Sequence, residues 1–229
     1  MRCLQNPVGL INPPLGALGG MASYAHRVMA WFGAALIAYW QMDETSGSTA
    51  GDSSPQGHDG TYSGVTLANM PLPGKVGGSG PRFDGANDYV SVYSAGFDSA
   101  FDGQVGSAMV WAKVYDASVW TDGVYRHCFN FFVDASNRVH IRKSGGAGNN
   151  QMEVWYKAAG VQETIYATSL TSTDWVHYAV TWSNVADEVK FFVNGVQAGG
   201  TQTGLGSWTG NLSAANTKIG AYDASQLSW

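Results

Sequence analysis

The chain has 229 residues, a formal net charge of −5, 30 glycines and 13% aromatic residues. This length suits one large all-β domain, and abundant glycine with few charged residues is typical of short strands joined by tight turns. The composition excludes a helical bundle and a disordered chain. The 12 Lys and Arg residues form no basic patch in the sequence, so we expect no nucleic-acid binding and no membrane insertion. Carbohydrate and protein partners remain open.

The first twenty residues are rich in proline and glycine and have no periodic pattern, so we predict a mobile leader over 1–20. Either Met1 or Met21 can be the natural start. From Ala22 to Phe32, apolar residues recur at helical spacing, and Gly33 can end a helix. We therefore predict one short N-terminal helix that covers the edge of a sandwich.

The apolar run 28–40 has two readings. It resembles the hydrophobic region of a secretory signal, but cleavage there would remove a predicted strand at Leu36–Met42. The run is also too short to span a bilayer. We favour a helix followed by a strand, and export by a leader stays open.

The rest of the chain alternates short strand patterns with turn residues. Predicted strands lie at Thr61–Tyr62, Val65–Leu67, Arg82–Phe83, Tyr89–Val92, Met109–Tyr115, His127–Val133, Val139–Arg142, Glu153–Tyr156 and Gln162–Ala167. This regular spacing, without intervening helices, indicates antiparallel pairing in two sheets.

The clearest element is a hairpin at Trp175–Gly195. Tyr178, Val180 and Trp182 alternate onto one face of its first strand, and three apolar residues of its second strand do the same. Asn194-Gly195 then supplies two residues that tolerate positive φ, which predicts another strand folding back over Val196–Gln202.

Five segments in this order carry a family resemblance. They are the hairpin, AYWQMDETSGSTAGDSS, GHDGTYSG, RFDGANDYVSV and KIGAYD. Together they resemble the laminin-G-like jelly roll of the concanavalin A-like lectin/glucanase superfamily. The opening SYAHRVMAWFGAALIAYWQMDE resembles members of phage or bacterial surface type. The implied fold is an all-β, two-sheet antiparallel jelly-roll sandwich over 21–229.

The resemblance also raises a question about the C-terminal end. In the family, a final strand with an acidic residue follows a segment like KIGAYD, whereas this chain ends at Trp229. Either the sequence is a fragment that lacks its final strand, or a strand-donating partner fills the C-terminal edge. We favour the fragment.

A structural calcium is the cofactor that the resemblance implies. Asp52 matches the family's calcium-binding aspartate, and Asp59 is a weaker second candidate, since hard cations prefer oxygen ligands. Pro55-Gln56 departs from the family pattern at this loop. The alternative is that Asp52 only bonds its own backbone in an Asx-turn.

We find no catalytic motif and expect no enzyme. Retaining glucanases of this fold carry Glu-x-Asp-x-(x)-Glu on one strand, with two carboxyl groups about 5 Å apart. Here Asp43-Glu44 and Asp187-Glu188 are adjacent pairs that point to opposite faces. Metal-site spacings of His and Cys are also missing. Cys3 and Cys128 can form a disulfide, but two separate thiols are favoured.

Ligand binding has better support. Alternation turns a set of aromatic and polar side chains away from the predicted core: Trp111, Trp155, Lys190, His177, Phe192 and Arg142. Sugar rings stack on aromatic rings, and their hydroxyls need directed polar partners. The alternative is that these rings pack under loops.

These observations predict a non-catalytic recognition module that binds a glycan or a surface protein, stiffened by calcium. The alternative is a structural or adhesive component of a phage virion or tail, or of a bacterial surface assembly. A glycoside hydrolase or lyase with an unrecognised site is the third hypothesis. Each of the first two implies an extracellular, cell-surface or virion-associated location.

Overall fold

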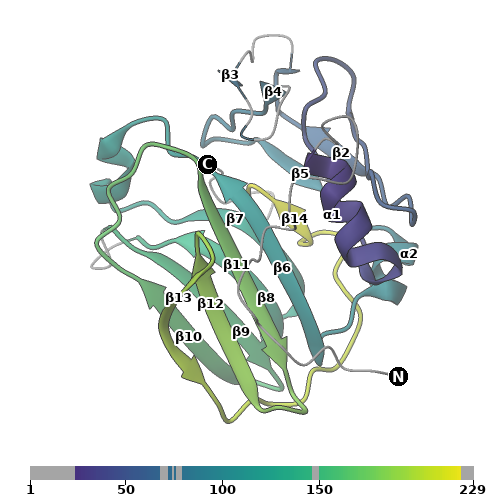
Figure 1. Ribbon diagram of the computed structural model, residues 1–229, viewed down its shortest axis with the longest axis vertical. Coiled ribbons are helices and arrows are strands. Elements are labelled where there is room, and N and C mark those ends of the chain that lie inside the picture. Colours follow the sequence, from purple (N-terminus) through teal and green to yellow (C-terminus); the bar gives the residue numbers. More distant parts are fainter. Residues whose placement is uncertain (1–23, 68–71, 74, 76–78, 146–149, 223–229) are drawn as a thin grey trace, which may run out of the picture.

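Two antiparallel sheets pack face to face in the computed structural model, which describes residues 24–67, 72–73, 75, 79–145 and 150–222 (Figure 1). The four-stranded sheet has the order β13-β12-β11-β6. Its strands are β6 (Val105–Ala112), β11 (Val176–Ser183), β12 (Glu188–Val193) and β13 (Val196–Gln202). The jelly-roll sandwich expected from the sequence is confirmed.

The second sheet has eight strands in the order β1-β2-β5-β14-β7-β8-β9-β10. They are β1 (Thr49–Ala50), β2 (Gly60–Ser63), β5 (Tyr89–Ser91), β14 (Lys218–Ile219), β7 (Arg126–Asp134), β8 (Asn137–Lys143), β9 (Met152–Ala158) and β10 (Val161–Ala167). A separate small hairpin pairs β3 (Leu72–Pro73) with β4 (Ser79–Gly80). The edge strands β10 and β13 contact each other and close one side of the sandwich.

The predicted hairpin is present as β11 and β12. Tyr178 lies opposite Val193, and Trp182 lies opposite Val189, so the apolar residues of both strands share one face. Asn194 and Gly195 have φ values of 49° and 81°, as the turn into β13 requires. The local turn chemistry thus agrees with the register of the sheet.

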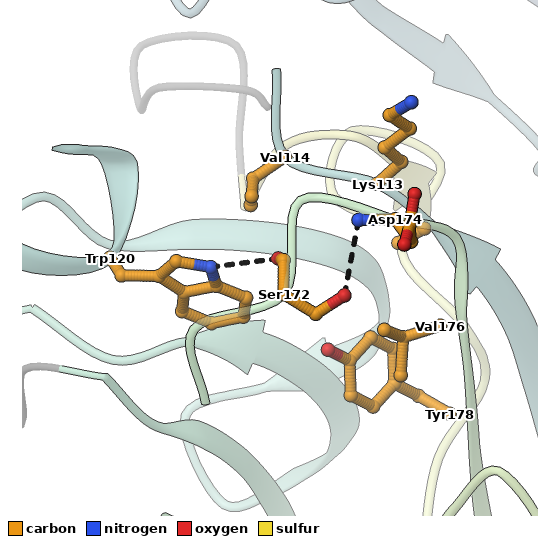
Figure 2. A pocket seen from close by; sticks show the side chains of 8 residues that line it. Lys113, Val114, Trp120, Ser172, Asp174, Val176 and Tyr178 are labelled. Carbon is orange, nitrogen blue, oxygen red and sulfur yellow. Dashed lines mark hydrogen bonds between the residues drawn. The ribbon is translucent and has the colours of Figure 1, made fainter. Parts of the chain in front are cut away.

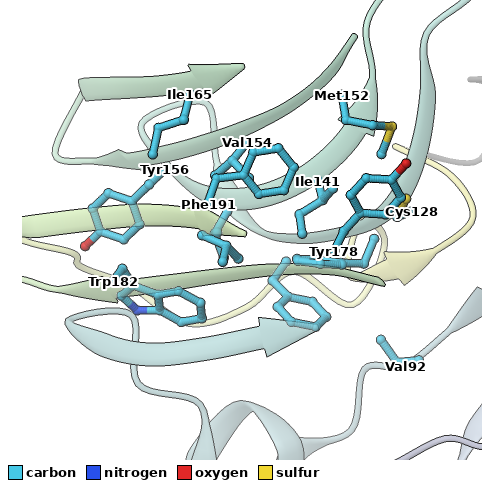
Figure 3. Close-up of a cluster of buried hydrophobic side chains, with 14 of the residues drawn as sticks. Val92, Cys128, Ile141, Met152, Val154, Tyr156, Ile165, Tyr178, Trp182 and Phe191 are labelled. Atoms are coloured by element: carbon cyan, nitrogen blue, oxygen red, sulfur yellow. The ribbon is translucent and has the colours of Figure 1, made fainter. Parts of the chain in front are cut away.

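The core lies between the inner faces of the two sheets, as Figure 3 shows. Trp182 and Phe191 from the four-stranded sheet meet Val154 and Tyr156 from β9, and all four are at most 3% exposed. Cys128 is also buried in this core, whereas Cys3 lies outside the described residues. Burying such aromatic and aliphatic surface is the main source of stability.

Helix α1 (Tyr24–Phe32) confirms the predicted N-terminal helix and continues into the 3-10 turn η1 (Gly33–Ala35). In Figure 1 it lies to the right of β6. The predicted leader over 1–20 falls outside the described residues.

Three predicted strands are wrong: Leu36–Met42, Val65–Leu67 and Arg82–Phe83 form no strand in the described chain. Within the first, Trp40 makes an isolated bridge with Asp52. The segment forms no strand because the Tyr39 backbone N–H donates to the Asp52 carboxylate at 2.7 Å rather than to a neighbouring strand. A side chain thus replaces part of the ladder.

Two short helical segments interrupt the strands, against the expectation of strands without intervening helices. Helix α2 (Ala95–Ala100) begins at Ser94, whose Oγ accepts from the Phe97 N–H at 3.0 Å. Phe97 packs edge-on against Phe131, 5.5 Å between centroids, so α2 covers part of the core. The 3-10 turn η3 (Ala117–Thr121) similarly buries Trp120. Both segments are too short to produce a helical repeat in the sequence.

The core predicts a large effect of truncating Phe191. This side chain is fully buried and stacks against Tyr178 with centroids 6.2 Å apart. We expect Phe191→Ala to lower the free energy of unfolding by about 3–5 kcal/mol in urea denaturation, because it removes packed aromatic surface and leaves a cavity. Val185→Ala, at an 88% exposed position, is the control and should change it by less than about 0.5 kcal/mol. Equal midpoints for the two variants would contradict this core.

Candidate functional site

The residues predicted to contact a ligand or metal lie in three places. Trp111, His177, Lys190 and Phe192 lie on the outer face of the four-stranded sheet; Arg142 and Trp155 lie on the outer face of the eight-stranded sheet; Asp52 and Asp59 lie in the loop from β1 to β2. Apart from Lys143, the strand neighbours of the first two groups lie in the core or pack against it. The predicted outward parity is therefore correct, but it describes two separate faces.

An aromatic pair marks the outer face of the four-stranded sheet. His177 on β11 lies directly opposite Trp111 on β6, with ring centroids 5.1 Å apart. The Trp111 indole Nε1–H donates to the Tyr24 hydroxyl of α1 at 3.4 Å, and the Lys75 ammonium lies 5.1 Å from the indole centroid. The indole is thus held from two sides.

The same face continues across β12. Phe192 lies opposite Ala179, and Lys190 lies opposite Thr181. The Lys190 ammonium pairs with the Glu188 carboxylate at 2.7 Å, which leaves donors of the ammonium for another partner. An apolar ring and a cation therefore stand one strand away from the Trp111–His177 pair.

A groove runs between this face and the N-terminal segment. Its lining includes Tyr24 and Val28 of α1 on one side and Trp111, His177 and Phe192 on the other. The hollow also extends past β6 to core residues such as Phe131 and Trp182, and we call its part over the outer face the outer-face groove. Burial lowers the pKa of His177, so its imidazole is neutral at pH 7 and offers one donor and one acceptor.

A second, smaller concave feature lies where β6 ends and β11 begins. This recess is lined by Trp120, Ser172, Asp174 and Tyr178 among others, and Figure 2 shows it from close by. The Trp120 indole donates to the Ser172 carbonyl at 3.0 Å. The recess has no interior space that admits even a water molecule, so we assign it no ligand.

The Asp52 carboxylate fastens the N-terminal segment to the sandwich. Its Oδ1 accepts from the N–H groups of Tyr39 and Ser54, and its Oδ2 accepts from the Ser54 hydroxyl and the His58 N–H, all at 2.7–2.8 Å. Burial alone would raise the pKa of the carboxyl, but these hydrogen bonds stabilise the ionised form and lower the pKa overall. Asp59 in turn accepts from the Asp52 N–H at 2.8 Å.

Calcium binding at Asp52 requires a different arrangement of this loop. The four donors occupy all four lone-pair sites of the carboxylate, so the residues as they lie do not fit a cation ligand. Over the described ranges, no group of three or more His, Cys, Asp and Glu is placed to hold a metal. Calcium at Asp52 and Asp59 stays an untested prediction, and the Asx-type bond to Ser54 N is present.

Comparison with known proteins identifies the family. Residues 83–229, more than half of the chain, match the laminin G family described as the concanavalin A-like lectin/glucanases superfamily. The chain belongs to this superfamily. Domains of the superfamily are typically extracellular binding modules, although one fold hosts many activities. Among the described residues, no helix has the length and apolar content needed to cross a bilayer.

Two further comparisons add nothing to the family assignment. No curated protein matches the chain. Among solved structures, domains LG4-5 of the mouse laminin alpha1 chain align with a TM-score of 0.40 at 9% identity, over 54% of this chain and 32% of that one. The alignment thus spans about a third of the laminin structure.

Several residues of the outer faces escaped the sequence prediction. Tyr24 and Lys75 reach Trp111 from segments outside the sheet, and pairing within strands does not show this. Arg138 lies beside Trp155, with its guanidinium carbon 5.1 Å from the indole centroid. The sequence does predict that Arg138 faces outward, because Arg138, His140 and Arg142 alternate along one strand.

The Asp52 network predicts a loss of stability on Asp52→Asn. The side-chain amide of the variant turns N–H donors toward groups that are themselves donors, so hydrogen bonds are lost. We expect the free energy of unfolding to fall by about 3 kcal/mol in urea denaturation at pH 7. Because the folded pKa is lowered, the ionised carboxylate stabilises the fold above the unfolded value of about 4, and this contribution is lost as pH falls through the folded pKa. The difference between wild type and variant should therefore shrink in acid.

Asp174→Asn, at an exposed position, is the matched control and should leave stability unchanged. The same urea denaturation, repeated in calcium and in chelator, tests whether a cation stabilises the fold. A wild-type midpoint that rises with calcium, and does not rise for Asp52→Asn, would overturn the purely hydrogen-bonded role of Asp52.

Proposed function

We propose that this protein is a non-catalytic recognition module that binds carbohydrate through the outer-face groove. The observation that carries the proposal is the Trp111–His177 pair, with centroids 5.1 Å apart on a sheet face that borders a groove. An aromatic plane beside hydrogen-bonding groups suits a sugar, whose C–H face packs on the ring. Shallow sites of this kind bind in the micromolar to millimolar range.

Each groove residue has a distinct chemical part in this proposal. The Trp111 indole supplies the stacking plane, and neutral His177 donates to one hydroxyl and accepts from another. Lys190 offers the ammonium donors that Glu188 does not use, and Phe192 adds a second apolar surface. The proposal is non-catalytic because the sequence lacks a one-strand carboxylate pair, and Glu188, at this face, is bonded to Lys190.

The test is binding of a broad panel of neutral and charged polysaccharides to the purified chain, measured by calorimetry. We expect Trp111→Ala to weaken binding at least tenfold, since it removes the stacking plane. Trp31→Ala is the matched control, because Trp31 is 74% exposed on α1 and does not line the groove. Its affinity should equal that of the wild type.

A thermal melt confirms that each variant is folded, and His177→Gln provides a second, smaller change at the same place. Unchanged affinity in folded Trp111→Ala would contradict the groove as the binding surface. Release of shorter saccharides during incubation would contradict the non-catalytic assignment.

A second candidate role is a structural or adhesive part of a phage virion or tail, or of a bacterial surface assembly. The edge of β6 favours it, because among the described residues no strand pairs with its outer side. This strand ends the four-stranded sheet, and its Val105 and Met109 side chains are 42% and 43% exposed. An unpaired edge with apolar side chains accepts a strand from a protein partner. The last described strand, β14, is paired on both sides, which supports β6 rather than β14 as the edge that accepts a donated strand.

Strand addition at β6 predicts self-association or co-assembly that a charge would block. Sedimentation of the wild type should shift to larger species as concentration rises, and Met109→Lys should keep the chain monomeric because a lysine on an edge opposes pairing. Val185→Lys, at an exposed turn position, should associate as the wild type does. A wild type that stays monomeric and captures no strand peptide would exclude this role.

A further inference from the structure

The outer face of the eight-stranded sheet carries a cluster that the groove does not use. Strand pairing places three rows across β7, β8, β9 and β10: His127, Arg142, Glu153 and Tyr166; Asn130, His140, Trp155 and Thr164; Phe132, Arg138, Lys157 and Gln162. Trp155 lies at the centre of this pattern, with one arginine in each neighbouring row. We call these residues the Trp155 cluster.

Two guanidinium groups flank the Trp155 indole. The Arg142 carbon lies 4.4 Å from the indole centroid, and the Arg138 carbon lies 5.1 Å from it. His140 stacks with the same indole at 5.2 Å and 28° between planes. Arg138 donates to the Tyr222 hydroxyl at 2.8 Å, and Arg142 pairs with Glu153 through its Nε. Each guanidinium has five N–H groups, so both retain donors.

Several buried polar atoms of the cluster have no hydrogen-bond partner within the part of the chain that the structure describes. They are both ring nitrogens of His127 and of His140, the Trp155 Nε1, the Arg138 Nε and one acceptor, the Asn130 Oδ1. His127 is 1% exposed and His140 is fully buried. Burial is the main cause that lowers the pKa of both histidines, with further lowering of the His140 pKa by His127 and of both by the two arginines, so both are neutral at pH 7. Buried polar groups without partners are rare in native proteins and call for an explanation.

The charge of the cluster points to an anion. Arg138, Arg142 and Lys157 provide three positive charges here, against the carboxylate of Glu153 and that of Asp134, which interacts electrostatically with Lys157. The chain as a whole carries −5, so this concentration of cations is local. The spare guanidinium N–H groups are donors, and an ionised oxygen is the acceptor that satisfies such donors best, whereas the Trp155 Nε1 and the Asn130 Oδ1 are buried away from a surface ligand.

The rim of the cluster suits a sugar ring. Tyr125 and Tyr166 are each 46% exposed, and the Arg142 guanidinium carbon lies 4.2 Å from the Tyr125 centroid. An exposed aromatic ring beside a guanidinium can pack against a saccharide whose carboxylate reaches the guanidinium. The planar fork of arginine matches a planar carboxylate in two parallel hydrogen bonds.

We propose that the Trp155 cluster is a second binding site, in which Arg138 and Arg142 hold the carboxylate of an acidic saccharide against the tyrosine rim. The inference rests on the proposed carbohydrate-recognition function and adds the class of ligand. The site lies on the opposite sheet from the outer-face groove, so one chain contacts a polymer at two separate surfaces.

The test measures binding of tetragalacturonate and of its methyl ester to the full chain by calorimetry. The wild type should bind the acid and lose at least tenfold in affinity for the ester, because esterification removes the charge. Arg138→Gln should weaken binding of the acid at least tenfold. Arg27→Gln removes the same charge at an exposed position of α1 and should bind as the wild type does.

Arg142→Lys serves as the second variant, since it keeps a positive charge beside the buried Glu153 and removes the planar fork. It should fold and also bind the acid more weakly. Nuclear magnetic resonance of the indole N–H groups gives an independent readout: the Trp155 signal, assigned by its loss in Trp155→Phe, should shift on adding the acid.

The outcomes separate this site from the groove. If Arg138→Gln binds the acid as the wild type does while Trp111→Ala does not, the ligand occupies the groove and the second site is overturned. Equal affinity for acid and ester, or an unmoved Trp155 signal, overturns it as well. If the wild type binds neither the acid nor the ester, this inference fails, whereas the proposed function fails only if the polysaccharide panel also shows no binding.

Discussion

The packing between the inner faces of the two sheets governs the rest of this structure. Trp182 and Phe191 must meet Val154 and Tyr156 to bury the apolar surface of both sheets. A shift of one residue in any of these strands would turn its apolar set to solvent, so burial determines register. Register in turn decides which side chains share an outer face. The Trp111–His177 pair and the Trp155 cluster are therefore consequences of the core.

The N-terminal segment depends on a different interaction. Residues 36–42 form no strand, and the Asp52 carboxylate ties this segment to its own loop: it accepts one hydrogen bond from the Tyr39 N–H and three from Ser54 and His58 of the loop. Because the segment continues from α1, the position of that helix over Trp111 depends in part on Asp52. One carboxylate in a loop thereby contributes to the shape of the groove on the other side of β6.

The two outer faces offer different chemistry on one fold. The outer-face groove combines an indole, a neutral imidazole and an ammonium paired with Glu188, and it is bordered by a helix. The Trp155 cluster has arginines around its indole and buried histidines that lack partners. The first resembles a surface for neutral polar rings, and the second a surface for an anion. The superfamily's fold permits both because each sheet exposes only its outer side chains.

Much of this protein was determined by the sequence alone. Period-two alternation told which side chains of β8, β9, β11 and β12 face outward, because that property depends only on the local chain. The turn at Asn194-Gly195 was equally local. The sequence also indicated the superfamily, to which residues 83–229 belong.

Only the tertiary structure decided which outward side chains lie together. Trp111 and His177 are 66 positions apart by number, and their contact depends on the pairing of β6 with β11. The six predicted ligand residues divide between two sheets for the same reason. The strand expected at Leu36–Met42 failed because a distant carboxylate took its backbone donor, a contact that no local pattern encodes. Alternation is a property of one strand, whereas a site is a property of several, and burial of the shared core brings those strands together.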